Sequence, residues 1–363
     1  MEMEKVSDIP RIEYISQKDE KVDKLNRELL KTIMSTDDCV AVDLNRIQIL
    51  DNSIEIIGNN YQLELYITGK KKDTLEKVEA DAKNIISYIR KNIDNISTLK
   101  DVKLTIYNLD GENTSGEYLM LQNIIYCEIE YQGNVHILDN GRWGVYNKRF
   151  QELLNEKLSE INKIVEFPEE FSIEYLSENS GVNSGEGGYI NKITKNKGML
   201  KLHKRNIVES GSKIEIADIY NKNTDELIAI KRGTDASKSM YSFEQSLMSI
   251  QALANPKDFS LRENLLRYNN RPKYQAKDYP NIREATVEKI MNCKNNTVLW
   301  LVDDKKKYVY NGVNKKDLKL QQFKSIMLKL KIVAWYDFSR EHDYEPKLYF
   351  ALDKPVKIDR DSV

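Results

Sequence analysis

Charged side chains interrupt three apolar, strand-like runs in the middle of this 363-residue sequence. The interior of the second run, residues 213–220, is apolar except for Glu215 and Asp218, and the third run, residues 226–233, ends its apolar part at Lys231. Unpaired charge is costly to bury. These side chains must therefore either pair with one another or bind a ligand.

The order of elements around these residues indicates one particular chemistry. Glu186 stands at the start of a short helix before the three runs, and a helix over residues 239–254 follows them. Helix–strand–strand–strand–helix–strand is the core order of restriction-endonuclease-like nucleases. In that fold a helix Glu, a strand Asp and a strand Lys surround Mg²⁺. Glu186, Asp218 and Lys231 occupy these three places in the sequence.

Each candidate has a definite role in such a site. We expect Glu186 and Asp218 to be the Mg²⁺ ligands, because hard cations prefer carboxylate oxygens. The metal would lower the pKa of a water and stabilise the charge that develops on the phosphate, while Lys231 would hold the attacking water. Gln245 lies on the following helix, where exonuclease-type members carry a glutamine. The predicted catalytic residues are Glu186, Glu215, Asp218, Lys231 and Gln245.

One position departs from the nuclease pattern. The residue two before Lys231 is Ala229, where an acid is expected. Glu215 could supply that second carboxylate only through a bulge, because residues three apart on a regular strand face opposite ways. Two interpretations therefore stay open: an active metal-dependent nuclease, and a degenerate core that binds nucleic acid or a partner without cutting.

Structural roles for the same residues compete with these. Asp218 and Lys231 could form a cross-strand ion pair that closes a hairpin. Glu186 could stabilise the N-terminus of its helix, and Gln245 could lie on a helix surface. His203 is expected as a polar strand residue and not as a ligand.

The elements that position these residues predict an α+β fold with a mixed sheet in its C-terminal part. The strand-like runs cover residues 199–207, 213–220 and 226–233, with a turn at 221–225. A strand–helix–strand unit near the C-terminus would extend the sheet. Beyond the core we expect a helix over residues 256–271, strands over 296–304 and 332–338 around a helix over 318–330, and an edge strand from residue 347.

The N-terminal part indicates a small α+β module to which we assign no chemistry. We expect three domains: this module over residues 1–115, a meander, helix and acidic connector over 116–185, and the nuclease-like core over 186–363. The expected elements are helices over 19–34, 73–97 and 151–164, strands within 38–67 and over 102–109, and a meander over 118–146.

Charge divides the chain into two halves. Residues 1–189 hold 22 Lys/Arg and 35 Asp/Glu, whereas residues 190–363 hold 34 and 22. Because excess positive charge attracts polyanions, we expect the second half to bind nucleic acid, with DNA as the first expectation. The acidic half would then bind a protein partner or a second copy. The alternative is that the two halves attract each other.

Other features bound the class of protein. No apolar run approaches the roughly 20 residues that span a bilayer. The cysteines Cys39, Cys127 and Cys293 lie far apart, in no disulfide or zinc-knuckle spacing. We therefore expect a cytoplasmic protein that does not bind membranes.

A basic tract near the C-terminus could extend a nucleic-acid surface. From Lys305 to Lys331 there are nine lysines and one acid, Asp317. Lysines release counterions from phosphates, and tyrosines can stack on bases. The alternative is a solvated helix face. The expected nucleic-acid-binding residues are Lys204, Arg205, Arg232, Lys238, Lys305, Lys306, Lys307, Tyr308, Lys315, Lys316 and Lys319.

Several short motifs occur in a fixed order between residues 142 and 246. They are Arg142-Trp143-Gly144-Val145-Tyr146, Glu186-Gly187-Gly188-Tyr189-Ile190-Asn191, Leu202-His203-Lys204, Ile214-Glu215-Ile216-Ala217-Asp218-Ile219, Ala229-Ile230-Lys231-Arg232 and Phe243-Glu244-Gln245-Ser246. With them, residues 115–340 resemble a bacterial family described as "sporadically distributed protein", which occurs near restriction and phage-defence genes. That family has Asp where this chain has His203, and His where it has Ala229. The resemblance implies an anti-phage defence setting and does not imply a reaction.

Overall fold

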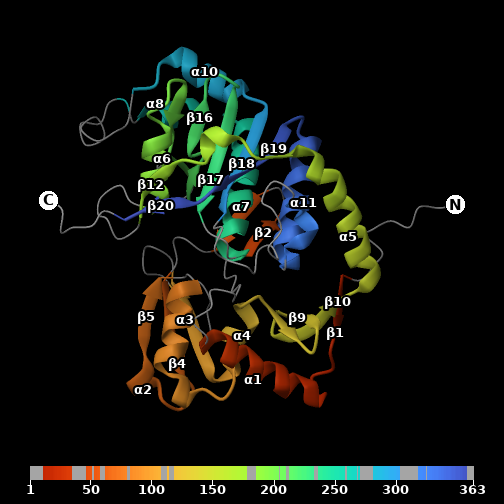
Figure 1. The fold of residues 1–363 in the computed structure, drawn as a ribbon. Helices are drawn as coiled ribbons and strands as arrows, with labels where there is room; N and C mark the ends of the chain where they lie inside the picture. Colours follow the sequence, from red (N-terminus) through yellow and green to blue (C-terminus); the bar gives the residue numbers. More distant parts are fainter. Residues whose placement is uncertain are drawn as a thin grey trace. The chain divides into compact units, whose positions relative to one another are not determined.

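The computed structural model describes residues 11–34, 46–50, 53–57, 62–79, 82–107, 113, 118–177, 185–203, 205–209, 212–232, 236–257, 260–267, 269, 281–302, 318–323 and 325–357. The chain divides into two compact units, residues 1–154 and 155–363. The division falls within helix α5, Lys148–Ile161. Both units combine helices with strands, so the protein has the expected α+β class (Figure 1).

Unit 1 contains a four-stranded antiparallel sheet in the order β5-β4-β6-β7. One face of this sheet packs on helices α1 and α3 in a single apolar core. A second four-stranded sheet has the order β1-β10-β9-β8, and β2 pairs with β3. The bounds are β1 Ile12–Tyr14, α1 Glu20–Met34, β2 Arg46–Leu50, β3 Ser53–Ile57, β4 Gln62–Ile67, α2 Lys71–Thr74, β5 Glu76–Glu79, α3 Ala82–Lys91, β6 Val102–Tyr107, β7 Leu119–Met120, α4 Leu121–Ile124, β8 Cys127–Tyr131, β9 Asn134–Asp139 and β10 Arg142–Tyr146.

Unit 2 is built on a six-stranded mixed sheet in the order β11-β19-β18-β17-β16-β13. The pairs among β11, β19, β18 and β17 are parallel, and β16 pairs antiparallel with both β17 and β13. The bounds are β11 Val165–Glu166, β12 Glu174–Leu176, α6 Gly185–Ile193, β13 Met199–Lys201, β14 Asn206–Glu209, β15 Ser212–Glu215, β16 Ile219–Asn221, β17 Glu226–Arg232, α7 Ala236–Ala254, α8 Leu261–Arg267, α10 Glu284–Asn292, β18 Asn295–Val302, α11 Ile326–Glu341, β19 Glu345–Leu352 and β20 Lys354–Val356.

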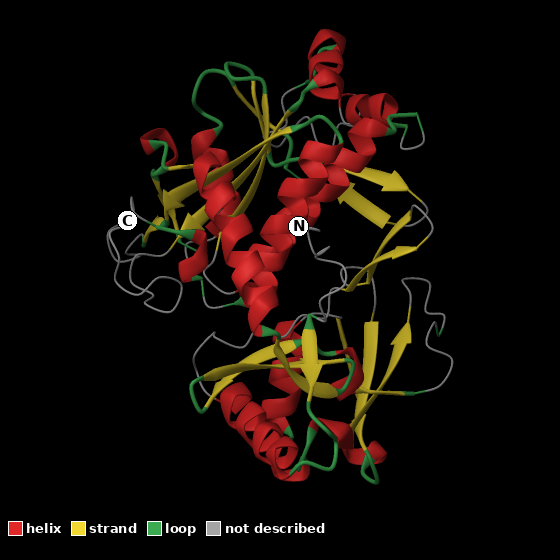
Figure 2. Ribbon diagram, turned by 90° about the vertical axis from the view of Figure 1, so that its right-hand side faces the viewer, coloured by secondary structure: helices red, strands yellow, loops and turns green. Residues whose placement is uncertain are grey.

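Helices pack on both faces of this sheet (Figure 2). Tyr189 and Ile190 of α6 share a buried cluster with Ile228 and Ile230 of β17. On the opposite face, Phe243 of α7 packs edge-on against Trp335 of α11, with 5.4 Å between the ring centroids. Alternate residues of β17 therefore face α6 and α7.

Two expected strands near the C-terminus need correction. Residues 332–338, expected as a strand, lie inside helix α11. The Ser325 hydroxyl caps that helix by accepting a hydrogen bond from the Leu328 amide at 3.1 Å. A short apolar run fits a buried strand or a buried helix equally well. Strand β19, expected at an edge, pairs with β11 on one side and β18 on the other, so it is an interior strand.

Three further predicted elements are interrupted. The predicted helix over residues 73–97 is interrupted by strand β5, which pairs with β4. The predicted strands over 199–207 and 213–220 are each broken, so that β13 and β16 stay in the sheet while β14 and β15 form a separate hairpin. The second of these breaks creates the candidate site.

Candidate functional site

The break between β15 and β16 places Asp218 against the main chain of β17. The Asp218 amide donates to the Ile228 carbonyl at 3.0 Å, and the Ile230 amide donates to Asp218 Oδ2 at 2.7 Å. Asp218 is only 2% exposed. One carboxylate oxygen is thus held by the backbone, which leaves Oδ1 directed to the neighbouring side chains.

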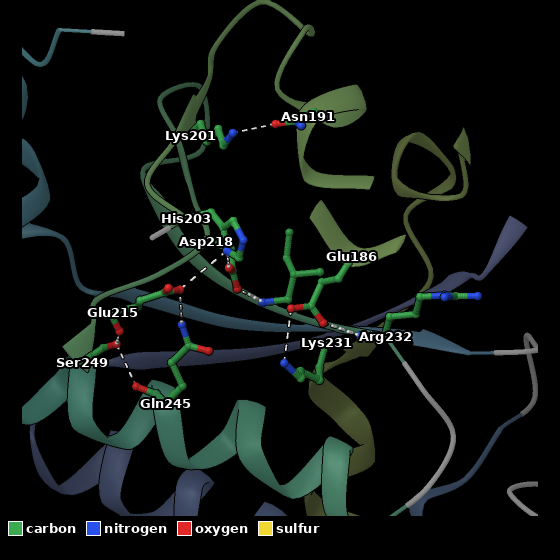
Figure 3. A network of polar contacts seen from close by, with 11 residues as sticks. Glu186, Asn191, Lys201, His203, Glu215, Asp218, Lys231, Arg232, Gln245 and Ser249 are labelled. Atoms are coloured by element: carbon green, nitrogen blue, oxygen red, sulfur yellow. Dashed lines mark hydrogen bonds and ion pairs between the residues drawn. The ribbon is translucent and has the colours of Figure 1, made fainter. Parts of the chain in front are cut away.

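His203 occupies that position. Its Nδ1 lies 2.7 Å from Asp218 Oδ1 and 3.6 Å from Glu215 Oε2 (Figure 3). Its backbone amide donates to the Asp218 carbonyl at 2.9 Å, which fixes the two residues side by side. The expectation that His203 is an ordinary strand residue is wrong. The chain leaves β13 at Lys201 and turns, and this turn brings the imidazole to the acids.

The same break between β15 and β16 explains how Glu215 and Asp218, three residues apart, can point to the same side. On a continuous strand the two carboxylates would point to opposite faces. Here Glu215 ends β15, and Ile219 begins β16, so residues 216–218 are not bound by strand geometry. Both carboxylates therefore reach one imidazole ring.

The ionisation of this cluster indicates a site that favours a positive charge. Burial opposes protonation of His203, but hydrogen bonds to Asp218 and Glu215 and their charges outweigh it and raise the pKa of the imidazole to about 9. Burial, followed by the charges of Glu215 and Glu186, raises the pKa of Asp218 to about 6, although the hydrogen bond from His203 opposes this. Between these two values the imidazolium is the cation that the acids share.

A second ion pair lies beside the cluster. Lys231 Nζ donates to Glu186 Oε1 at 3.2 Å, and the Arg232 amide donates to Glu186 Oε2 at 3.1 Å. Glu186 therefore binds the end of β17, and the structure pairs Lys231 with Glu186, whereas Asp218 pairs with His203. Figure 3 shows Glu186 and Lys231 next to the Asp218 cluster.

Helix α7, on the face of the sheet opposite α6, supplies further polar groups to the cluster. Gln245 Nε2 donates to Glu215 Oε2 at 3.5 Å. One turn later, the Ser249 hydroxyl contacts the Ile216 carbonyl and donates to the Gln245 carbonyl at 2.8 Å. Gln245 is only 8% exposed, so it is part of this network and not a helix-surface residue.

The five predicted catalytic residues thus come together, and the possible metal ligands among the described residues overlap the predicted pair, Glu186 and Asp218, only at Asp218. Within the described residues, one group could hold a metal ion: His203, Glu215 and Asp218, with ligand atoms all within 4.8 Å of one another. Glu186, an expected ligand, is not part of that group. Its carboxylate is held instead by Lys231 and the main chain of Arg232.

The expected nucleic-acid-binding residues have mixed outcomes. Arg205 is only 2% exposed and donates to the Leu265 carbonyl at 3.4 Å, so the expectation of a surface phosphate contact there is wrong. Arg232 Nε donates to both carboxylate oxygens of Asp353, at 3.1 and 2.9 Å. Lys319 is exposed. Outside the described residues or side chains lie Lys204, Lys238, Lys305, Lys306, Lys307, Tyr308, Lys315 and Lys316.

His203 is the site residue that reasoning from the sequence missed. The sequence offers a weak signal, because a histidine four residues after the start of the strand-like run 199–207 is a potential cation ligand.

Comparisons with known proteins give a family and no individual relative. None of the curated proteins and none of the solved structures matches the chain. None of the helices in the described ranges has the length and apolar character that a membrane crossing needs. A family model described as "Family of unknown function (DUF6119)" matches residues 3–316. The chain therefore belongs to this DUF6119 family.

Proposed function

We propose that this protein is a metal-dependent nuclease, with DNA as its expected substrate. The observation that carries the proposal is the convergence of Asp218, Glu215 and Lys231 on one end of the β16–β17 pair. They come from the element order α6, β13, β16, β17, α7, β18, with β17 and β18 parallel. This order supports a restriction-endonuclease-like core for unit 2.

The donor set supports a divalent cation as cofactor. Glu215 and Asp218 offer carboxylate oxygens, and His203 offers a ring nitrogen, within one small volume. Carboxylates suit Mg²⁺ and Mn²⁺, whereas imidazole suits transition metals. A mixed set of this kind favours Mn²⁺ over the Mg²⁺ expected from the acids alone. Such a cation would lower the pKa of a bound water and stabilise charge on the phosphate.

The remaining residues have roles that follow from their contacts. Lys231 would donate to a phosphate oxygen or to the attacking water, because its ammonium already lies at the edge of the acidic cluster. Glu186 would keep Lys231 in place, and its second oxygen holds the end of β17 through the Arg232 amide. Water would add to phosphorus and lose a proton to the solvent, the P–O bond to the leaving sugar oxygen would break, and that oxygen would take up a proton from the solvent.

The test is a cleavage and binding assay on plasmid DNA, single-stranded DNA and RNA, with Mn²⁺, Mg²⁺ or EDTA. We expect metal-dependent cutting that is greater with Mn²⁺ and that Lys231→Met removes while binding persists. Lys319→Met is the matched control, because Lys319 is an exposed lysine of the same unit. Cutting that continues in EDTA, or that survives Lys231→Met, would refute the proposal.

A second candidate is a nucleic-acid-binding protein without catalysis. The observation that favours it is that the chain itself supplies a cation to the acids: His203 to Asp218 and Lys231 to Glu186. Ala229 in place of an acid points the same way. Binding without cutting in every metal, unaffected by Lys231→Met, would favour this candidate.

The setting that we propose for either activity is bacterial phage defence in the cytoplasm. This rests on the motifs shared with the resembled family. The basic half would bind the nucleic acid, and the acidic half would bind a protein partner or a second copy. Protection of a bacterial host against infecting phages, lost on Asp218→Asn, is the measurement that tests this setting.

A further inference from the structure

The sheet β5-β4-β6-β7 of unit 1 has a second face that the proposed site does not use. Leu63, Leu65 and Leu104 point into the core shared with α1 and α3. The alternate residues therefore occupy the opposite face. On it, the strand register sets Tyr66 opposite Lys103, and Gln62 opposite Tyr107.

Each of three tyrosines on or beside this face has a lysine ammonium over its ring. The Lys71 ammonium lies 4.6 Å from the centre of the Tyr66 ring, and Lys77 lies 5.3 Å from that of Tyr107. A third pair has the same form, with 4.3 Å between the Lys103 ammonium and the centre of the Tyr118 ring. We call this set the tyrosine–lysine face: Tyr66, Tyr107, Tyr118, Lys71, Lys77 and Lys103.

Several members of the face are open to solvent. Tyr118 is 56% exposed, an unusual level for a large aromatic residue. The side chains of Lys71 and Lys77 are 57% and 62% exposed. A single exposed aromatic residue needs no explanation, but three aromatic–lysine pairs gathered on one face form a patch that a ligand could bind.

The charge of the face differs from that of its unit. Residues 1–154 hold 20 Lys/Arg and 27 Asp/Glu. The face carries three lysines against Glu64, which Lys71 and Lys77 each approach to 3.8 Å, and Glu79, which the register sets opposite Gln62. By this count the face has a net charge of +1, whereas residues 1–154 together have a net charge of −7.

We propose that the tyrosine–lysine face binds single-stranded nucleic acid. Unpaired bases stack on aromatic rings, and this stacking tolerates any sequence because every base has a π-face. Each ring has a lysine beside it that can turn to the adjoining phosphate. Paired bases offer no free face, so duplexes bind weakly here. The inference does not depend on catalysis in unit 2.

The test is fluorescence anisotropy of the full-length protein with a labelled oligonucleotide of about 12 nucleotides, a length within usual single-strand site sizes. EDTA is present throughout to exclude cleavage. Tyr66→Leu and Tyr118→Leu should each weaken binding roughly tenfold, as for one lost stacking contact, whereas Tyr118→Phe should not. The matched control is Tyr14→Leu, because Tyr14 is 40% exposed and lies under Arg142 in the other sheet of unit 1.

Ultraviolet crosslinking of the bound oligonucleotide, mapped by mass spectrometry, should mark peptides that contain Tyr66, Tyr107 or Tyr118. Separate experiments with a DNA oligonucleotide and an RNA oligonucleotide of the same sequence show which of the two the face prefers. Crosslinks that are absent from these peptides, or that are as strong with a duplex of the same sequence, would overturn the inference, because crosslinks report on this face even when unit 2 also binds the oligonucleotide. Neither result depends on whether unit 2 cleaves, so failure here is distinguishable from failure of the nuclease proposal.

Discussion

Glu226, at the start of β17, and Asp218, beside the middle of that strand, are both buried carboxylates, 1% and 2% exposed, yet their partners differ. Glu226 contacts the Lys347 ammonium and accepts from the Tyr349 and Thr224 hydroxyls, both at 2.9 Å. Asp218 accepts from the Ile230 amide at 2.7 Å, and it shares the His203 imidazole with Glu215.

The comparison separates an acid that supports the fold from one that prepares a site. A buried acid that supports the fold needs its own cation and hydrogen-bond donors, and Glu226 has both. Acids that converge on a single proton-binding group leave an excess of negative charge, and an added cation can relieve it. The second arrangement costs stability, and a function is the usual reason to keep it.

The largest effect should come from the same isosteric change at both positions. Asp218→Asn should lower metal-dependent cleavage at least about 100-fold, the usual result of removing one preorganised charge from an active site. Glu226→Gln should leave cleavage per folded molecule unchanged, because its partners are structural. Initial rates measured at equal folded concentration, checked by circular dichroism, test this. Equal losses in the two variants would remove the distinction.

For the free energy of unfolding we expect the reverse: a change at the Glu226 pair should cost more than a change at the candidate site. Lys347→Met leaves the 1% exposed Glu226 without its cation and should cost about 3 kcal/mol of the free energy of unfolding. Lys231→Met should cost less than about 1 kcal/mol, because Glu186 is 23% exposed and keeps the Arg232 amide. Urea unfolding followed by tryptophan fluorescence measures both. A larger loss for Lys231→Met would contradict the comparison.

The metal-free site should also respond to pH. The pKa of His203 rises from 6.5 to about 9 on folding, so the folded state binds more protons than the unfolded state between these values. Its stabilising effect is therefore complete below about pH 6.5 and is lost as the pH rises to about 9, a loss on the order of 2 to 3 kcal/mol. Urea unfolding in EDTA at several pH values should show this decline, and His203→Gln should lack it. A decline of the same size in His203→Gln would assign it to other groups.

The smallest effect concerns helix α7. Gln245 reaches Glu215 over a long 3.5 Å hydrogen bond, so Gln245→Leu should weaken Mn²⁺ binding by about tenfold or less. Titration calorimetry measures this, with Gln251→Leu on the same helix as the control. A complete loss of binding would mean that Gln245 is itself a ligand.

Local pattern and element order were enough to predict which acids and which lysine meet. Glu186, Asp218 and Lys231 lie at element ends that any α-β-β-β-α arrangement brings together. His203 could not be placed, because its position depends on a turn after β13 that has no Gly or Pro to indicate it. The break between β15 and β16 likewise has no sequence signal, so the sequence shows only that a bulge is needed if Glu215 is to act together with Asp218.

The type of secondary structure could not be predicted from the sequence where contacts with residues far along the chain determine it. Residues 76–79 have a helix-like pattern, and pairing with β4 makes them a strand. Residues 332–338 are apolar enough for a strand, and the helical spacing of the buried residues shows only when Ile332 and Trp335 are taken together with Ser339, just beyond the run. Propensity is a weak prior, which tertiary contacts override.

The interior position of β19 has a consequence for synthesis on the ribosome. The chain emerges from its N-terminus, so β18 at residues 295–302 is complete well before its neighbour β19 at residues 345–352. During this interval the outer edge of β18 has no strand partner, and such an edge invites association with other chains. The sheet that supports Asp218 and Lys231 is completed only when residue 352 has emerged.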